Sequence, residues 1–268
     1  MTLLKRFFCL SIAMAPLFAI AEPMTAEQIM QKVYDRDDGD NAVMEMEMIL
    51  IDKQGQERNR TVKSWRRDAG ANKQDHESIM FFLAPADVKD TGFLTYDFDD
   101  ADKDDDQWLY LPALKKTKRI ASSDKSSSFM GTDFTYADMT ERNIKNYTYT
   151  ILKEEKVNDA DTWVIESVPA NEKEKSETGY TKSVLFVRKD NFVVIRGINW
   201  LDKGGKLKYM EIKKLEQIDG IWIGTETTMS TKKDKETLHQ TILKSKHVQF
   251  NQPQGDDFYS TRKLEQGT

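Results

Sequence analysis

Short turn sequences recur along the chain and separate segments in which apolar and polar side chains alternate. Lys203-Gly204-Gly205 and Asp219-Gly220 are hairpin-type turns in the second half of the chain. Connections this short favour antiparallel neighbours, because parallel strands need long crossovers. The predicted strands cover residues 43–52, 58–67, 76–83, 92–98, 107–111, 116–120, 147–153, 162–168, 181–188, 192–201, 207–217, 221–230 and 236–250.

One helix is predicted, at the start of this series. Thr25-Ala26-Glu27-Gln28 has the form of a capping box, and apolar residues follow at helical spacing up to about Arg36. No linker rich in Pro, Gly or Ser divides the chain into two halves. We therefore predict one mainly β (α+β) domain. Its core is a single curved antiparallel sheet, or unclosed β-barrel, of about a dozen strands with a short N-terminal helix.

The inner face of such a sheet carries a row of apolar residues that is rich in methionine. Met44, Met46, Met48 and Leu50 occupy alternate positions of the first predicted strand. Methionine fills packed cores, and it also lines surfaces that accept varied apolar ligands, so both interpretations stay open. The residues predicted to line an apolar cavity are Met44, Met46, Met48, Leu50, Trp65, Phe186 and Trp200.

One short helix is too small to cover a wide inner face. The irregular segment 121–142 is rich in serine and then in aromatic residues, and we expect it to lie over the sheet together with the helix. Incomplete cover would leave a cavity. Within this segment, residues 122–136 are predicted to form a lid or portal with Phe129, Met130, Phe134 and Tyr136 as its apolar side chains. The alternative is an ordered loop that plugs the barrel permanently.

The N-terminus has the form of a secretory signal peptide. Two basic residues precede an apolar run at 7–20, and small residues stand before the predicted cleavage between Ala21 and Glu22. The apolar run is too short to span a bilayer comfortably. We therefore expect residues 1–21 to be removed, without a lipid anchor, and residues 22–268 to form the exported domain.

Composition and motifs argue against several classes of function. The chain has 40 Lys and Arg against 45 Asp and Glu, a net charge of −5, which disfavours binding to nucleic acid. Its one cysteine, Cys9, lies in the predicted signal peptide, and no nucleophile elbow or phosphate-binding glycine loop occurs. The acidic run 97–106 lacks the glycine and the closing glutamate of a calcium loop, so we expect a solvated hairpin tip. We expect no enzymatic activity, no metal and no cofactor.

The stretch 107–139 reads QWLYLPALKKTKRIASSDKSSSFMGTDFTYADM. Together with Phe82-Leu83-Ala84-Pro85, Thr91-Gly92-Phe93-Leu94 and Phe250-Asn251-Gln252-Pro253, it resembles the bacterial outer membrane lipoprotein-sorting protein family, which is related in fold to the carrier LolA and the receptor LolB. The resemblance implies an unclosed β-barrel with a helical lid over an apolar cavity. It also implies a periplasmic carrier of lipid or acyl chains that works beside inner-membrane transporters of the RND/MMPL type.

Two classes of function fit these expectations. The first is a periplasmic carrier that binds lipid or acyl chains, lipoproteins among them, and moves them towards an outer-membrane acceptor. The second is an accessory module that docks on an RND/MMPL transporter and carries nothing. A continuous apolar cavity open at one rim favours the carrier, whereas a barrel filled by its own side chains favours the module.

Overall fold

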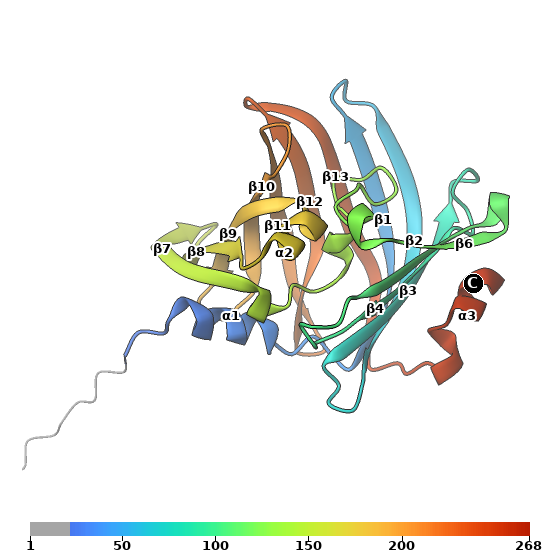
Figure 1. Ribbon diagram of the computed structural model, residues 1–268, viewed down its shortest axis with the longest axis horizontal. Coiled ribbons are helices and arrows are strands. Elements are labelled where there is room, and N and C mark those ends of the chain that lie inside the picture. Colours follow the sequence, from blue (N-terminus) through green and yellow to red (C-terminus); the bar gives the residue numbers. More distant parts are fainter. Residues whose placement is uncertain (1–21) are drawn as a thin grey trace, which may run out of the picture.

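The computed structural model describes residues 22–268, and its central feature is one sheet of 13 antiparallel strands (Figure 1). The strand order is β6-β5-β4-β3-β2-β1-β13-β12-β11-β10-β9-β8-β7. The strands are β1 (Asn41–Asp52), β2 (Glu57–Ala69), β3 (Asp75–Ala84), β4 (Gly92–Asp97), β5 (Asp106–Leu111), β6 (Lys116–Arg119), β7 (Tyr147–Val157), β8 (Ala160–Pro169), β9 (Tyr180–Arg188), β10 (Val194–Leu201), β11 (Lys206–Ile218), β12 (Ile221–Lys233) and β13 (Glu236–Phe250).

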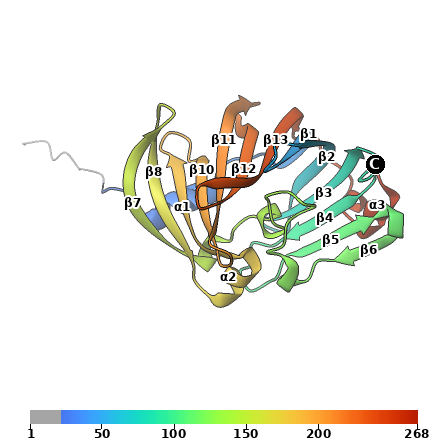
Figure 2. The ribbon, with the colours of Figure 1, turned by 90° about the horizontal axis from the view of Figure 1, so that it is seen from above.

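The sheet consists of two meanders, the first formed by β1–β6 and the second by β7–β13, which meet where β1 pairs with β13. Seen from above, it bends into an open trough whose edge strands, β6 and β7, lie far apart (Figure 2). This arrangement confirms the prediction of a single curved, unclosed antiparallel sheet with about a dozen strands.

Helix α1 (Ala26–Tyr34) forms because its first turn is capped and one of its faces is apolar. The Thr25 hydroxyl accepts from Gln28 N at 3.2 Å, and the Gln28 side chain accepts from Thr25 N at 2.9 Å, so the predicted capping box is present. Ile29 and Met30 are buried against Ile165 of β8 and Val187 of β9. The helix therefore covers the inner face of the second meander.

The chain between β6 and β7, residues 120–146, forms the inner segment of the trough. It contains three short 3₁₀ helices, η2 (Ser122–Asp124), η3 (Ala137–Met139) and η4 (Ile144–Asn146). Phe129 is buried at its centre, against Met48, Phe82 and Phe93 of the first meander. The ring centroids of Phe93 and Phe129 are 5.0 Å apart. This half of the trough is therefore filled by the chain itself.

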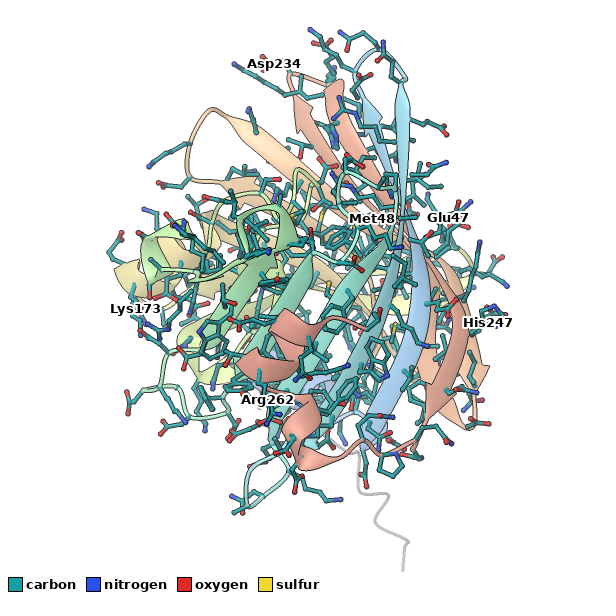
Figure 3. The ribbon with its side chains drawn as sticks, turned by 90° about the vertical axis from the view of Figure 1, so that its right-hand side faces the viewer. Glu47, Met48, Lys173, Asp234, His247 and Arg262 are labelled. Carbon is teal, nitrogen blue, oxygen red and sulfur yellow. The ribbon has the colours of Figure 1, made fainter. Side chains whose placement is uncertain are left out.

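The C-terminus covers the opposite, outer face of the first meander. Helix α3 (Thr261–Gln266), preceded by η5 (Asp256–Phe258), lies across β3, β4 and β5 (Figure 3). Leu264 and Tyr259 are buried there against Phe81 and Leu94. The sequence did not predict α3, nor α2 (Glu172–Thr178) and η1 (Pro112–Leu114), because each is too short for an apolar period to show.

Replacing Leu264 by Ala should destabilise the protein by about 2–5 kcal/mol, because it opens a cavity under α3. The Leu264 side chain is 0% exposed. The matched control is Leu114→Ala, because Leu114 is 62% exposed and lies in η1. Urea unfolding of both variants tests this, and equal free energies of unfolding would contradict the role given to α3.

Candidate functional site

An apolar cavity of about 600 Å³ lies between α1, the inner face of the second meander and the end of the inner segment. Its volume falls in the range of about 300–1,000 Å³ that is typical of small-molecule sites. Most of its walls are hydrocarbon. The apolar side chains that line it are Met30, Val33, Ala42, Met44, Phe134, Ile144, Leu185, Phe192, Val193, Val194, Met210, Ile212, Ile221, Trp222, Ile223, Met229 and Phe250.

Two of the predicted cavity and lid residues line this cavity, namely Met44 of β1 and Phe134 of the inner segment. The methionine row divides along β1. Met48 and Leu50 are buried in the closed core around Phe129, and Met46, Met130 and Tyr136 pack against the same core. The row is therefore core at Met46, Met48 and Leu50, and it faces the cavity at Met44.

Three other predicted residues lie away from the cavity. Phe186 follows Leu185, and Trp200 follows Asn199, and it is Leu185 and Asn199 that line the cavity. Neighbouring residues of a strand face opposite sides, so the sequence prediction was wrong by one position on both strands. Trp65 packs on the outer face beneath the C-terminal segment, where its ring centroid is 5.2 Å from that of Phe258.

Sequence reasoning missed the small residues that make room for the cavity. Gly197 of β10 and Gly224 of β12 both lie on its wall. A glycine inside a strand often marks a place where another group approaches closely. These two glycines could therefore have indicated the cavity wall from the sequence. The contribution of Met30 and Val33 depends on where α1 docks, which no local pattern shows.

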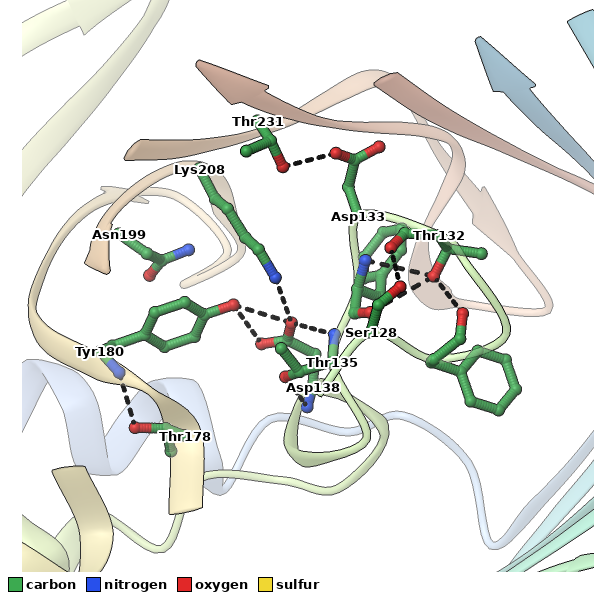
Figure 4. A network of polar contacts seen from close by, with 12 residues as sticks. Ser128, Thr132, Asp133, Thr135, Asp138, Thr178, Tyr180, Asn199, Lys208 and Thr231 are labelled. Carbon is green, nitrogen blue, oxygen red and sulfur yellow. Dashed lines mark hydrogen bonds and ion pairs between the residues drawn. The ribbon is translucent and has the colours of Figure 1, made fainter. Parts of the chain in front are cut away.

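A buried carboxylate fixes the inner segment to the sheet beside the cavity (Figure 4). Asp133 is 3% exposed. Its oxygens accept hydrogen bonds from Thr231 of β12 at 2.5 Å and Thr241 of β13 at 2.8 Å, and Oδ2 lies 2.6 Å from His239 Nδ1. Its backbone N–H also donates to the Thr241 hydroxyl at 2.9 Å. One residue thus ties the inner segment to two strands.

A second carboxylate, Asp138 on η3, makes the corresponding contacts to the other strands. The Tyr180 hydroxyl of β9 donates to it at 2.8 Å, and Lys208 Nζ of β11 lies 3.8 Å from Oδ2 (Figure 4). Burial raises the pKa of Tyr180, which keeps the phenol protonated as the donor. Burial lowers the pKa of Lys208, and the charges of Asp138 and Asp133 oppose that shift. Any opening of the inner segment must break these contacts.

The acidic run is only partly a solvated tip. Asp97 is buried, and its carboxylate accepts from Glu141 N at 2.6 Å. Burial, followed by the charge of Asp105, raises the pKa of Asp97 well above its ordinary 3.8. These residues line a separate polar pocket of about 90 Å³ that also includes His76. Within residues 22–268, no group of His, Cys, Asp and Glu is arranged to hold a metal ion.

None of the helices formed by residues 22–268 combines the length and hydrophobicity needed to cross a bilayer. An unclosed antiparallel sheet that curves around an apolar cavity, with a helix and an inner segment as cover, defines a LolA-type fold. A LolA superfamily protein from Nitrosomonas europaea shares this fold with a TM-score of 0.68 at 18% identity, over 90% of this chain and 100% of that one.

Two further structures show closer similarity. An outer membrane lipoprotein-sorting protein domain from Vibrio parahaemolyticus is 30% identical, with a TM-score of 0.80 over 90% of this chain and 98% of its own. A DUF1329 family protein from Desulfovibrio piger is 26% identical, with a TM-score of 0.81 over 89% of this chain and 97% of its own. A protein-family model described as "Uncharacterized protein" matches residues 74–266. No curated protein matches the chain significantly. The chain belongs to the outer membrane lipoprotein-sorting protein family.

Asp133→Asn should lower the free energy of unfolding by about 1.5–3 kcal/mol, because an amide replaces a buried charged acceptor. It should also make the inner segment more sensitive to protease. The control is Asp124→Asn in the same segment, where the side chain is 47% exposed and lies 3.5 Å from Lys118 Nζ. Urea unfolding and limited proteolysis measure both effects. Equal protease sensitivity of the two variants would show that Asp133 does not hold the segment.

Asp97→Asn should stabilise the protein at neutral pH and reduce its pH dependence. Because the pKa of Asp97 is raised on folding, its contribution to stability is fully present below 3.8 and is lost as pH rises through the raised value. The asparagine oxygen can still accept from Glu141 N. Unfolding free energies of wild type and variant are compared at several pH values between neutrality and pH 3.8. If the difference in unfolding free energy between wild type and variant does not shrink on acidification, the pKa of Asp97 is not raised by folding.

Proposed function

We propose that this protein is a periplasmic carrier that binds lipid or acyl chains, lipoproteins among them, for transfer towards the outer membrane. The observation that supports this function is the apolar cavity of about 600 Å³ between α1 and the inner face of the sheet. Hydrocarbon walls suit hydrocarbon ligands, and burial contributes about 0.8 kcal/mol per methylene removed from water.

The energetics fit a carrier that must release its ligand. Full burial of a sixteen-carbon chain would contribute roughly 12 kcal/mol before costs are subtracted. Association itself costs about 4 kcal/mol or more, and ordering a flexible chain adds to that cost. Net binding is then moderate, so an acceptor with a larger apolar surface can take the chain.

The same cavity disfavours an accessory module that carries nothing. Side chains around an empty apolar volume lose packing contacts, and such cavities destabilise a fold. Around Phe129 the inner segment fills its half of the trough, but α1 leaves open space over the other half. Retaining that space is understandable if a ligand occupies it during transport.

Export and partners are also part of the proposal. The predicted signal peptide and Ala21, on the N-terminal side of the predicted cleavage site, lie outside the described residues. Glu22, on its other side, begins the described chain, and α1 starts four residues later at Ala26. We assign residues 22–268 to the exported carrier domain. An inner-membrane transporter of the RND/MMPL type and an outer-membrane acceptor are its proposed partners, supported by the family resemblance alone.

Gly197→Leu should weaken binding of a long acyl chain by about tenfold or more, because keeping roughly two methylenes out of the cavity costs about 1.6 kcal/mol. A Cβ at this position would lie 3.6 Å from Met210 Cε and 3.7 Å from Leu185 Cδ2, which are ordinary contacts. The protein should therefore still fold.

The matched control is Gly255→Leu, where a Cβ would meet nothing within 4 Å. Native mass spectrometry with added fatty acids and lipopeptides, and displacement of a fluorescent fatty acid, give the affinities. Absence of binding by the wild-type protein would reject the carrier function. Equal binding by both variants would place the site elsewhere.

A further inference from the structure

Most polar side chains on the wall of the apolar cavity are already paired within the protein. Arg66 forms an ion pair with Asp38 and donates to the Asp38 and Gly39 carbonyls at 2.7 and 3.0 Å. Arg36 Nη1 donates to two carbonyls, those of Asp37 and Trp222, at 3.1 and 3.0 Å. These two arginines fix the turn between α1 and β1 and its contact with β12.

Arg142 differs from both. It follows η3 and lies on the wall of the cavity, where its guanidinium stands 5.2 Å from the ring centroid of Tyr180 and 5.8 Å from that of Tyr147. Nη1 donates to Ser183 Oγ at 2.9 Å and Nη2 donates to Asn199 Oδ1 at 3.3 Å. Both acceptors are neutral, and Arg142 forms no ion pair with any part of the chain that the structure describes.

Unused donors gather at this end of the cavity. A guanidinium has more N–H groups than the two contacts of Arg142 use. The Oδ1 atom of Asn199 accepts from Arg142 and from Ser183, whose hydroxyl lies 2.6 Å away. That arrangement leaves the Asn199 amide N–H groups free of any acceptor within residues 22–268, and Asn199 itself lines the cavity.

Two neighbouring acidic groups, Asp138 and Glu141, do not supply the missing acceptor. The carboxylate of Asp138 accepts from the Tyr180 hydroxyl and from Thr135 N at 2.8 Å each, and it lies 3.8 Å from the Lys208 ammonium. Glu141 lies at the same wall, but its carboxylate faces His76 Nε2 at 3.6 Å. A cation thus borders an apolar cavity with N–H groups that no acceptor of the described chain uses, and an anionic group of a ligand could accept from them.

We propose that Arg142, with Asn199 beside it, binds the anionic head of an amphiphile whose acyl chain fills the apolar cavity. The chemistry is that of a single oxyanion, carboxylate or phosphate monoester, joined to one long chain. This inference rests on the proposed carrier function and specifies the class of its ligand. An arginine fork matches either oxyanion, because both present oxygens for two parallel N–H···O bonds.

The test compares three ligands of equal chain length on the wild-type protein, namely palmitate, hexadecyl phosphate and hexadecanol. At least one of the two anions should bind about tenfold or more tightly than the alcohol, and the better of them identifies the head group. Equal affinities for all three would overturn the role of Arg142 and leave the carrier function intact. If the protein binds none of the three and no lipopeptide, the carrier function itself is refuted.

Arg142→Gln should remove the preference for the anion and leave hexadecanol binding unchanged, and Arg142→Lys should restore part of the preference. The control is Arg262→Gln, because Arg262 lies on α3 at the outer face (Figure 3). A preference that survives in folded Arg142→Gln would overturn the proposal.

A measurement on the wild-type protein keeps the proposal testable if that variant does not fold. The ¹³C resonance of carboxyl-labelled palmitate is followed with pH. Contact with a guanidinium stabilises the ionised form, so the bound carboxyl should titrate below the pKa of the same carboxyl in a detergent micelle. Titration at or above the micelle value would contradict the proposal.

Discussion

Two carboxylates, the buried Asp133 and the partly buried Asp138, hold the inner segment against the inner face of the open sheet. A trough with free edges exposes a wide apolar inner face, and the inner segment must cross it with polar backbone that needs partners. The side chains of Asp133 and Asp138 anchor the segment, the first to β12 and β13 and the second to β9 and β11. Because a buried charge is stable only with several hydrogen bonds, the position of the inner segment is strongly specified. The cavity is the space that this segment and α1 leave uncovered.

Local sequence patterns predicted the architecture well because antiparallel meanders are built from neighbouring segments. Asp219-Gly220 and the alternation in β1 act over a few residues, and the capping box at Thr25 acts over one turn. The cavity wall was harder to predict. Alternation along a strand separates two faces but does not tell which of them is the inner one, and Phe186 and Trp200 were assigned to the wrong face. In β10 a register shift between Val194 and Arg196 also interrupts the alternation.

Other features depend on contacts between distant parts of the chain. Trp65 looks like an inner residue from its strand alone, but Phe258 and Tyr259 of the C-terminus cover it on the outer face. Short helices such as α3 gain their stability from tertiary packing, so their own sequence shows little preference. Asp97 is similar, because its acidic neighbours suggest solvent while β4 and the inner segment bury it. Such features can be recognised only in the folded structure, because they depend on contacts between segments far apart in the sequence.

The pairing of β1 with β13 divides the molecule into two halves that are packed differently. The first meander has packed layers on both faces, with Phe129 inside and α3 outside, and it is suited to act as a stiff frame. The second meander forms most of the cavity wall, and all of its strand connections except the one that contains α2 are short hairpins. Under the proposed carrier function, a change in cavity volume on ligand binding would fall on the second meander and not on the packed first meander. If the protein carries a ligand as proposed, the ligand would enter and leave beside the second meander, and the surface of the packed first meander would stay unchanged.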